Sequence, residues 1–168
     1  MENFKIALKQ CLVHNNYYGA LFIALSLPDI CGKLEHPDST SSSRYVAWFD
    51  KYIREKYIGG PNNDIFLTGS DCYALRCSLL HEGRDNISEQ KIQETLEKFK
   101  FVSLPQGNII HNNRVGEMLQ LQVDIFCNDI LEGIENWEEH IKDNKQIQEK
   151  MTNLLIITFP EENGSIRI

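Results

Sequence analysis

The first part of the chain alternates apolar and polar positions at the spacing of an amphipathic helix. Apolar residues recur every three or four positions from Asn3 to Leu27, which predicts a long helix with one buried stripe. Asn15 and Asn16 interrupt the stripe, so the pattern leaves room for a break there. We expect the helix to end at Pro28, because the residue before a proline is disfavoured in the helical conformation.

A loop, a second helix and a stop signal follow the first predicted helix. A polar, turn-rich loop is expected over His36–Ser43. A second helix is predicted over Ser43–Tyr57, with its aromatic residues on one side. The glycine, proline and asparagine residues of Ile58–Asp64 predict a stop after it.

A third helix is predicted over Thr68–Glu82, and its ends carry clear signals. Thr68 is a suitable N-cap, with Asp71 three residues later as the acidic partner of a capping box. Gly83 stands where a helix commonly ends in a left-handed residue. The interior is apolar nearly all round, which predicts a helix enclosed by the bundle or by a partner chain.

The pattern after Gly83 changes several times. We expect a short helix capped by Asn86 or Ser88, with Ile92, Leu96 and Phe99 on one face. A small hairpin is predicted next, its strands running over Phe99–Leu104 and Asn108–His111 on either side of Pro105-Gln106-Gly107.

The longest amphipathic stripe lies in the C-terminal third. It is formed by Leu119, Val123, Phe126, Ile130, Ile134, Trp137 and Ile141, which predicts a long helix packed on one face. The segment Leu154–Phe159 is short, apolar and rich in β-branched residues, so it is expected to add a strand to the hairpin.

Together these elements predict a mainly α, single-domain helical bundle over residues 1–160, with a small β element near the C-terminal half and a tail at 161–168. The 168 residues are enough for one core, and the 42% hydrophobic and 24% charged residues are typical of a globular protein.

The net charge of −7 is unevenly distributed. Residues 1–116 contain 13 acidic and 13 basic residues, whereas residues 117–168 contain 11 acidic and 4 basic ones. A protein that binds duplex nucleic acid through a broad basic face needs clustered Lys and Arg. That class is therefore excluded, and any nucleic-acid chemistry must be local.

The cysteines and the N-terminus indicate where the protein resides. The five cysteines are odd in number and include no C-x-x-C pair, which argues against a disulfide framework and a zinc site of the usual spacing. No signal peptide is recognisable, and the most apolar stretch, Ala20–Leu27, is far shorter than a bilayer span. We expect a soluble, cytoplasmic protein without a membrane partner.

The most informative candidate chemistry is a pair of residues on the third predicted helix. Arg76 lies five residues before His81, on the most enclosed helix of the chain. An unpaired guanidinium in apolar surroundings is costly, so Arg76 must contact an acceptor, water or an anionic ligand. A guanidinium beside an imidazole suits phosphodiester chemistry, because one neutralises phosphate oxygens and the other transfers protons.

The segment Leu75–Gly83, LRCSLLHEG, resembles the signature of the HEPN superfamily (higher eukaryote and prokaryote nucleotide-binding domains). That signature is an arginine, four to six residues, then a histidine, near the end of a helix in an all-helical bundle. Arg76 and His81 match it with four residues between them. The resemblance covers residues 1–150 in the order of elements, and only its nine-residue core is specific.

The resemblance implies a metal-independent endoribonuclease of a toxin–antitoxin or defence type, without a cofactor. It also implies a homodimer in which two copies of the 68–83 helix form a composite cleft for RNA. Arg76 would stabilise the charged phosphate, and His81 would act as base or acid. Asp71, Cys77, Ser78 and His111 are candidate supporting residues.

Alternatives remain open at this point. Active HEPN members usually carry a polar residue directly after the arginine, and here it is Cys77. A non-catalytic HEPN-like module for dimerisation, nucleotide binding or a protein partner is therefore the second hypothesis, with Arg76 and His81 pairing with Asp71, Glu82 or Asp85. A thiol or metal site at Cys77 and His81, which are four residues apart, is the third.

Overall fold

The computed structural model describes residues 1–105 and 107–157, and most of its regular structure is helical. The helices are α1 (Glu2–Val13), α2 (Tyr17–Glu35), α3 (Ser41–Tyr52), α4 (Gly69–Glu82), α5 (Val123–Ile141) and α6 (Lys145–Met151), with the 3-10 turn η1 (Arg54–Tyr57) after α3. The strands are β1 (Ile58–Gly59), β2 (Asp64–Ile65), β3 (Lys98–Val102), β4 (Asn113–Val115) and β5 (Met118–Gln122). None of the helices in the described ranges has both the length and the apolar character that crossing a bilayer requires.

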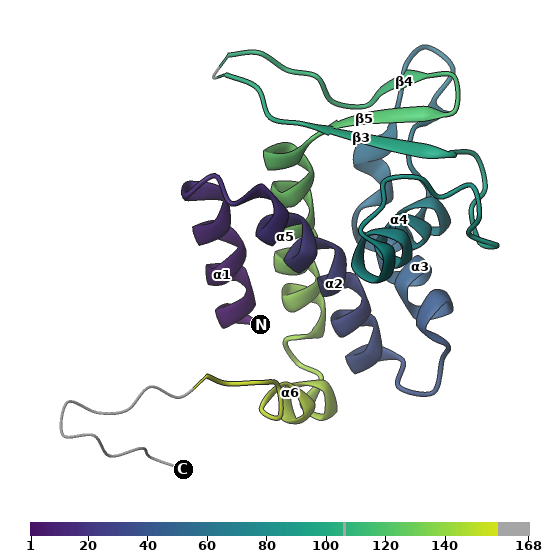
Figure 1. Cartoon of the computed structure of the whole chain (residues 1–168). Helices are drawn as coiled ribbons and strands as arrows, with labels where there is room; N and C mark the ends of the chain where they lie inside the picture. The colour runs from purple at the N-terminus through teal and green to yellow at the C-terminus, as the bar shows by residue number, and fades with distance from the viewer. Residues whose placement is uncertain (106, 158–168) are drawn as a thin grey trace.

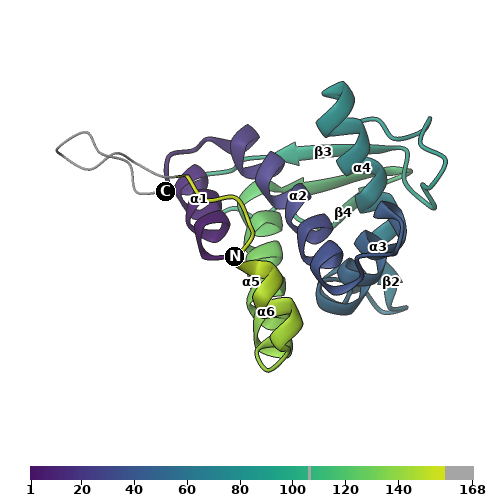
Figure 2. The ribbon, with the colours of Figure 1, turned by 90° about the horizontal axis from the view of Figure 1, so that it is seen from below.

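The mainly α, single-domain architecture expected from the sequence is confirmed. The sheet of β3, β5 and β4 lies across one end of the helices, and α6 lies at the other end (Figure 1). Helix α2 contacts α1, α3, α4 and α5, which makes it the central helix of the bundle. Seen from below, α6 lies beside the end of α5 (Figure 2). The expected tail at 161–168 is outside the described residues.

The first predicted helix is two helices, with the break at the two asparagines. Asn15 adopts a positive φ of 55°, which asparagine tolerates better than most residues. Asn16 caps α2, because its side chain accepts a hydrogen bond from the Gly19 amide at 3.1 Å. The interruption in the apolar stripe therefore marks a real helix boundary.

The prediction that Pro28 ends the helix is wrong, because α2 continues to Glu35. An interior proline costs a helix about 3 kcal/mol. Beyond it, however, Cys31 is fully buried and Leu34 is 8% exposed. Each large apolar side chain that is buried contributes about 1.5–3 kcal/mol, so the packing of the last turns outweighs the proline.

The second predicted helix begins slightly earlier and is divided. Helix α3 starts at Ser41, because Thr40 accepts a hydrogen bond from the Ser43 amide, and the preceding loop is accordingly shorter than expected. The chain leaves the α conformation at Ile53 and continues as η1. The predicted stop at Ile58–Asp64 coincides with the antiparallel β1–β2 hairpin.

The short helix expected after Asn86 is absent, and the segment up to β3 is irregular. Its backbone makes isolated turns, such as the bond from the Gln90 amide to the Ile87 carbonyl, and bonds between residues further apart, without the repeated pattern of a helix. The Ile87 amide donates to the Glu97 carbonyl at 2.8 Å, and the Glu94 amide donates to the Asp71 carboxylate at 2.7 Å. Ile87 and Leu96 are buried, so the segment packs without forming a helix.

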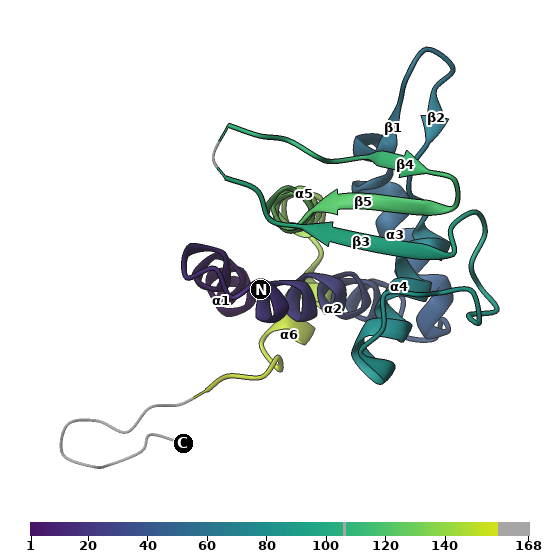
Figure 3. The ribbon, with the colours of Figure 1, turned by 45° about the horizontal axis from the view of Figure 1, so that its top comes forward.

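The predicted hairpin is also wrong in its pairing. Strand β3 pairs in parallel with β5, in the register Lys98↔Met118, and β4 pairs antiparallel with β5, in the register Asn113↔Gln120. The sheet order is therefore β3–β5–β4, as Figure 3 shows. The turn between the antiparallel strands β4 and β5 lies at Gly116, whose φ is 61°.

The long C-terminal helix is confirmed from Val123 onward, where its apolar stripe is buried. Leu119 lies in β5 and not in the helix. Leu119 and Leu121 are both buried on one face of strand β5. This spacing of two is hard to recognise in the sequence, because the apolar stripe of the following helix adjoins it. The segment 154–157 is not a strand, and residues 158–159 of that prediction lie outside the described residues.

Gly133 gives a test of the packing between α5 and the α3–η1 junction. A Cβ at this position would overlap Ile53 Cδ1 and lie 3.2 Å from Trp48 Cη2. Gly133→Ala should therefore destabilise the fold by about 1–3 kcal/mol, because overpacking outweighs the gain in helix propensity. Ile53→Val removes the overlapping methyl group, so the double variant should lose less stability than the two single variants together. Denaturant unfolding of all four proteins checks this, and additive losses would contradict it.

Candidate functional site

Helix α4 carries the candidate site, and local sequence fixes both of its ends. Thr68 Oγ1 accepts a hydrogen bond from the Asp71 amide at 3.0 Å. At the other end Gly83 has a left-handed φ of 69°, and the amides of Gly83 and Arg84 donate to the carbonyls of Leu79 and Ser78. The helix therefore ends directly after His81 and Glu82, as predicted.

Arg76 and His81 are in contact. Arg76 Nη1 donates to His81 Nε2 at 3.1 Å. A guanidinium can only donate, so this hydrogen bond requires a lone pair on Nε2, as in the tautomer with its proton on Nδ1. The arginine bends along the helix to reach the exposed last turn. The structure thus brings together the two side chains that the sequence analysis singled out.

The acidic partner of Arg76 is Asp29 on α2. Arg76 Nη2 donates to Asp29 Oδ2 at 3.2 Å, and Arg44 Nε donates to Asp29 Oδ1 at 2.9 Å. Ser41 also donates to this carboxylate. The expected acidic partners Asp71, Glu82 and Asp85 make no ion pair with Arg76 within the described residues. Sequence reasoning missed Asp29, which follows the proline where α2 was expected to end.

The side chains around Asp29 carry a net positive charge, although the protein as a whole is acidic. Two guanidinium groups share one carboxylate, and the three side chains are only 15–19% exposed. The Nε of Arg76 is buried and has no hydrogen-bond partner among the described residues. Partly buried charges are screened less than exposed ones, so this region beside His81 suits one anionic group.

The candidate supporting residues on α4 have structural contacts. Ser78 is buried and donates through Oγ to the Asn86 carbonyl at 2.6 Å. Asp71 is fully buried, and its carboxylate accepts from the Glu94 amide and from the amide and hydroxyl of Thr95. The Asp71 carboxylate also accepts from Thr68 Oγ1 at 3.2 Å, so it links the N-cap of α4 to the 94–95 backbone.

Cys77 lies half-buried on the same side of α4 as Leu80 and is a free thiol. No contact with His81 is present among the hydrogen bonds of the described residues, although the two are four positions apart. Within residues 1–105 and 107–157, no three His, Cys, Asp or Glu side chains lie close enough together to hold a metal ion.

His111 belongs to a different part of the molecule. Its Nδ1 accepts from the Gln122 amide at 3.3 Å, and its Nε2 lies 3.7 Å from Asp129 Oδ2. The ring also packs on Tyr57, whose hydroxyl donates to Asp129 at 3.0 Å. The expectation that His111 supports the Arg76–His81 pair is therefore wrong in placement, because the loop before β4 carries it to η1, β5 and α5.

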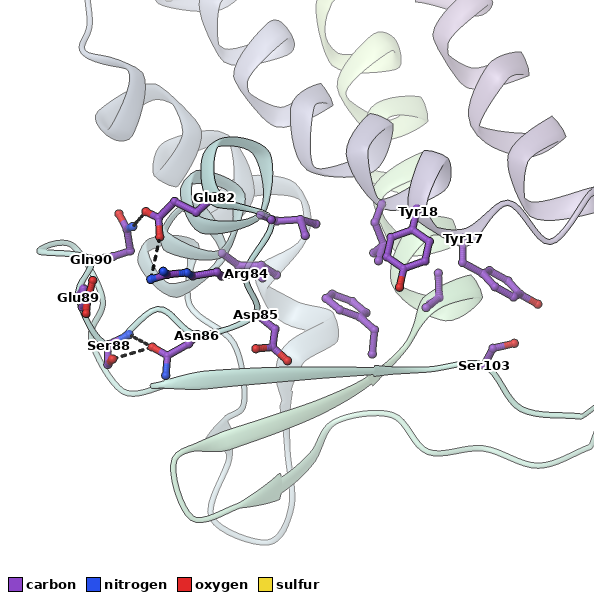
Figure 4. A pocket seen from close by; sticks show the side chains of 16 residues that line it. Tyr17, Tyr18, Glu82, Arg84, Asp85, Asn86, Ser88, Glu89, Gln90 and Ser103 are labelled. Carbon is purple, nitrogen blue, oxygen red and sulfur yellow. Dashed lines mark hydrogen bonds and ion pairs between the residues drawn. The ribbon is translucent and has the colours of Figure 1, made fainter.

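A cavity of about 800 Å³ lies on the other face of α4. It is formed by the start of α2, the last turns of α4, the segment 83–90, the end of β3 with Ser103 after it, and the first residue of α5. Figure 4 shows its polar side chains gathered around Glu82 and Arg84, with Tyr17 and Tyr18 across from them. Neither Arg76 nor His81 lines it, so α4 separates the cavity from the pair.

Comparison with known proteins gives no family. No family model, no curated protein and no solved structure matches the chain.

The buried position of His111 predicts a pH dependence of stability. Burial lowers the pKa of His111 below its ordinary value, and the nearby Asp129 and Asp124 oppose this only in part. The unfolded chain therefore binds a proton near pH 6.5 that the folded protein does not. The free energy of unfolding should therefore be highest above that pH, and it should fall as the pH drops toward the pKa of His111 in the folded protein. His111→Gln should flatten this part of the curve in urea unfolding measured from pH 7.5 to 5, with His36→Gln as the control. An unchanged slope would contradict the prediction.

Proposed function

We propose that the chain is a HEPN-like endoribonuclease that cleaves RNA without a metal cofactor, with Arg76 and His81 as its catalytic pair. The observation that supports this most is the 3.1 Å contact between Arg76 Nη1 and His81 Nε2 at the exposed end of α4. It joins the phosphate-binding group and the proton-transfer group that RNA cleavage needs. The resemblance of residues 75–83 to the HEPN signature supports the same assignment.

In the proposed reaction the ribose 2′-hydroxyl attacks the adjacent phosphorus, and the bond from phosphorus to the 5′-oxygen breaks. The products are a 2′,3′-cyclic phosphate and a 5′-hydroxyl. His81 accepts the 2′-hydroxyl proton while water protonates the leaving 5′-oxygen, or His81 protonates the leaving oxygen while water accepts the hydroxyl proton. Arg76 donates to the phosphate oxygens, whose charge increases in the transition state.

Substrate binding must rearrange the pair before His81 can act as a base. The lone pair of Nε2 is occupied by Arg76 Nη1. When a phosphate oxygen takes over the guanidinium N–H, the lone pair becomes free for a proton. Arg76 would remain oriented through Nη2, which is held by Asp29.

A homodimer through α4 completes the proposal. Arg76, Cys77, Leu80 and His81 lie within an arc of about 140° around the helix at 100° per residue. Cys77 and Leu80 are half-buried in the single chain, so packing against a second α4 would cover them and place two Arg76–His81 pairs at one cleft. A cytoplasmic location fits such an enzyme, since its five cysteines are all free.

A second candidate function is a non-catalytic module on the same fold. The observation that favours it is the bond from Arg76 to Asp29, since Asp29 also binds Arg44 and Ser41. Such a network holds α4 against α2 and α3 without any substrate. The protein would then bind a nucleotide, RNA or a protein partner without cleaving it.

The ribonuclease proposal predicts loss of cleavage from two single substitutions. Arg76→Ala and His81→Ala should each reduce cleavage of a labelled RNA pool by at least about a hundredfold, because each removes one catalytic group. The purified full chain is assayed with and without EDTA, and the ends of the products are identified. A 2′-deoxy substitution at the cleavage position should block the reaction.

The controls are an exposed arginine and an exposed histidine outside α4. Arg54→Ala removes a surface guanidinium whose nearest carboxylate is 3.8 Å away, and His14→Ala removes an exposed imidazole. Both should cleave like the unmodified protein. Equal cleavage by all variants would trace the activity to a contaminant. No cleavage by the unmodified chain, with a lower thermal stability of Arg76→Ala, would favour the second candidate.

A further inference from the structure

The cavity on the far side of α4 is large enough to be a binding site in its own right. Its volume of about 800 Å³ lies within the range of pockets that bind ligands in proteins. It opens between elements that are distant in the sequence, since the start of α2, the end of α4 and the end of β3 all contribute. The Arg76–His81 pair does not use it.

The inner wall of the cavity is apolar. It is lined by Leu21, Leu75, Leu79, Phe101 and Val123. Tyr17 and Tyr18 stand beside this wall, and Tyr18 is 78% exposed. A large aromatic side chain left that exposed beside a cavity supplies contact area for a partner at low entropic cost.

The rim of the cavity is acidic. Glu82, Asp85 and Glu89 lie on it, and Arg84 is the only Lys or Arg that lines it among residues 1–105 and 107–157. Arg84 Nη1 lies 3.7 Å from Glu82, which also accepts a hydrogen bond from Gln90 (Figure 4). Asp85 and Glu89 are exposed, and neither makes an ion pair within the part of the chain that the structure describes. The rim therefore carries uncompensated negative charge.

The apolar wall and the acidic rim together restrict the kind of ligand that can bind in the cavity. A phosphate-bearing ligand would meet carboxylates where it needs cations. A second copy placed symmetrically on this face would bring two acidic rims together, at a cost in repulsion. A ligand with an apolar body and cationic groups can pack on the wall and pair with the carboxylates of the rim.

We propose that the cavity binds a segment of a partner protein in which one or two large apolar side chains are flanked by lysine or arginine. The apolar side chains enter between Tyr18 and the α4 wall, and the flanking cations pair with Asp85 and Glu89. This site is independent of the proposed ribonuclease. Because it lies on the opposite face of α4, the partner can bind while Arg76 and His81 stay accessible, and it contacts the residues that directly follow His81.

The experiment selects displayed short random peptides against the full chain. Peptides that also bind the variant Tyr18→Ala/Asp85→Asn/Glu89→Gln are removed. The proposal predicts enrichment of sequences with Trp, Phe or Leu between Lys or Arg. Enrichment of acidic sequences, of sequences without an apolar residue, or of none at all would overturn it.

One enriched peptide is then synthesised, labelled and titrated by fluorescence anisotropy. Asp85→Asn/Glu89→Gln should weaken its binding by about fivefold or more, since rim charges contribute modestly each. Tyr18→Ala should weaken it at least as much. The matched controls are Asp38→Asn/Glu55→Gln, which removes two exposed carboxylates elsewhere, and Val13→Ala, which trims an apolar side chain that is 76% exposed.

The controls decide between this site and general attraction to an acidic protein. Equal weakening by Asp38→Asn/Glu55→Gln would overturn the proposal, and so would binding of tryptamine as tight as that of the peptide, which would make the cavity a small-molecule site. RNA cleavage is measured on the same variants. A protein that cleaves no RNA but binds the peptide with this pattern would refute the ribonuclease and leave the partner site established.

Discussion

The carboxylate of Asp29 holds the candidate site together. It lies at the junction of α2, α3 and α4, and it binds Arg44 and Arg76 on its two oxygens. All three charges are mostly buried. Removing one member of such a buried group leaves an uncompensated charge, which costs about 3–5 kcal/mol. The direction in which Arg76 points is therefore fixed by the helix bundle, and His81 receives its hydrogen bond only because Asp29 already holds the other guanidinium nitrogen.

Helix α4 owes its position to two other polar groups that the sequence alone did not explain. Asp71 accepts three hydrogen bonds from residues 94–95, and Ser78 donates to the Asn86 carbonyl. Both side chains are buried, so an unsatisfied partner would be costly. Together they fasten the irregular segment between α4 and β3 along the helix. The first part of this segment, residues 83–90, lines the cavity together with the start of α2.

Local signals predicted α4 and α5 well, and long-range pairings were not visible in the sequence. The caps of α4 at Thr68 and Gly83 depend on residues within one turn, so the helix bounds could be derived. Pro28 was misjudged, because the residues that keep α2 helical beyond it gain their energy from tertiary burial. The parallel pairing of β3 with β5 joins segments about twenty positions apart, and alternation alone does not reveal which strands pair. Arg76 and His81 could be singled out by residue type and position, but Asp29 could not be, because no short spacing links it to them.

The bond between Arg76 and His81 determines what the pair can do in the absence of substrate. The hydrogen bond from the charged guanidinium to a neutral imidazole has only one ionised partner, whereas a bond from the guanidinium to a phosphate joins two opposite charges. A phosphate that reaches Arg76 Nη1 therefore displaces His81 at a net gain. In the proposed reaction the same exchange would release Nε2 beside the phosphate, so that binding of the substrate would also free the proposed base. A carboxylate ligand would make the same exchange, but it would offer no hydroxyl proton for His81 to take. The geometry thus couples the state of the imidazole to the presence of an anion, and the chemistry of that anion decides whether a reaction follows.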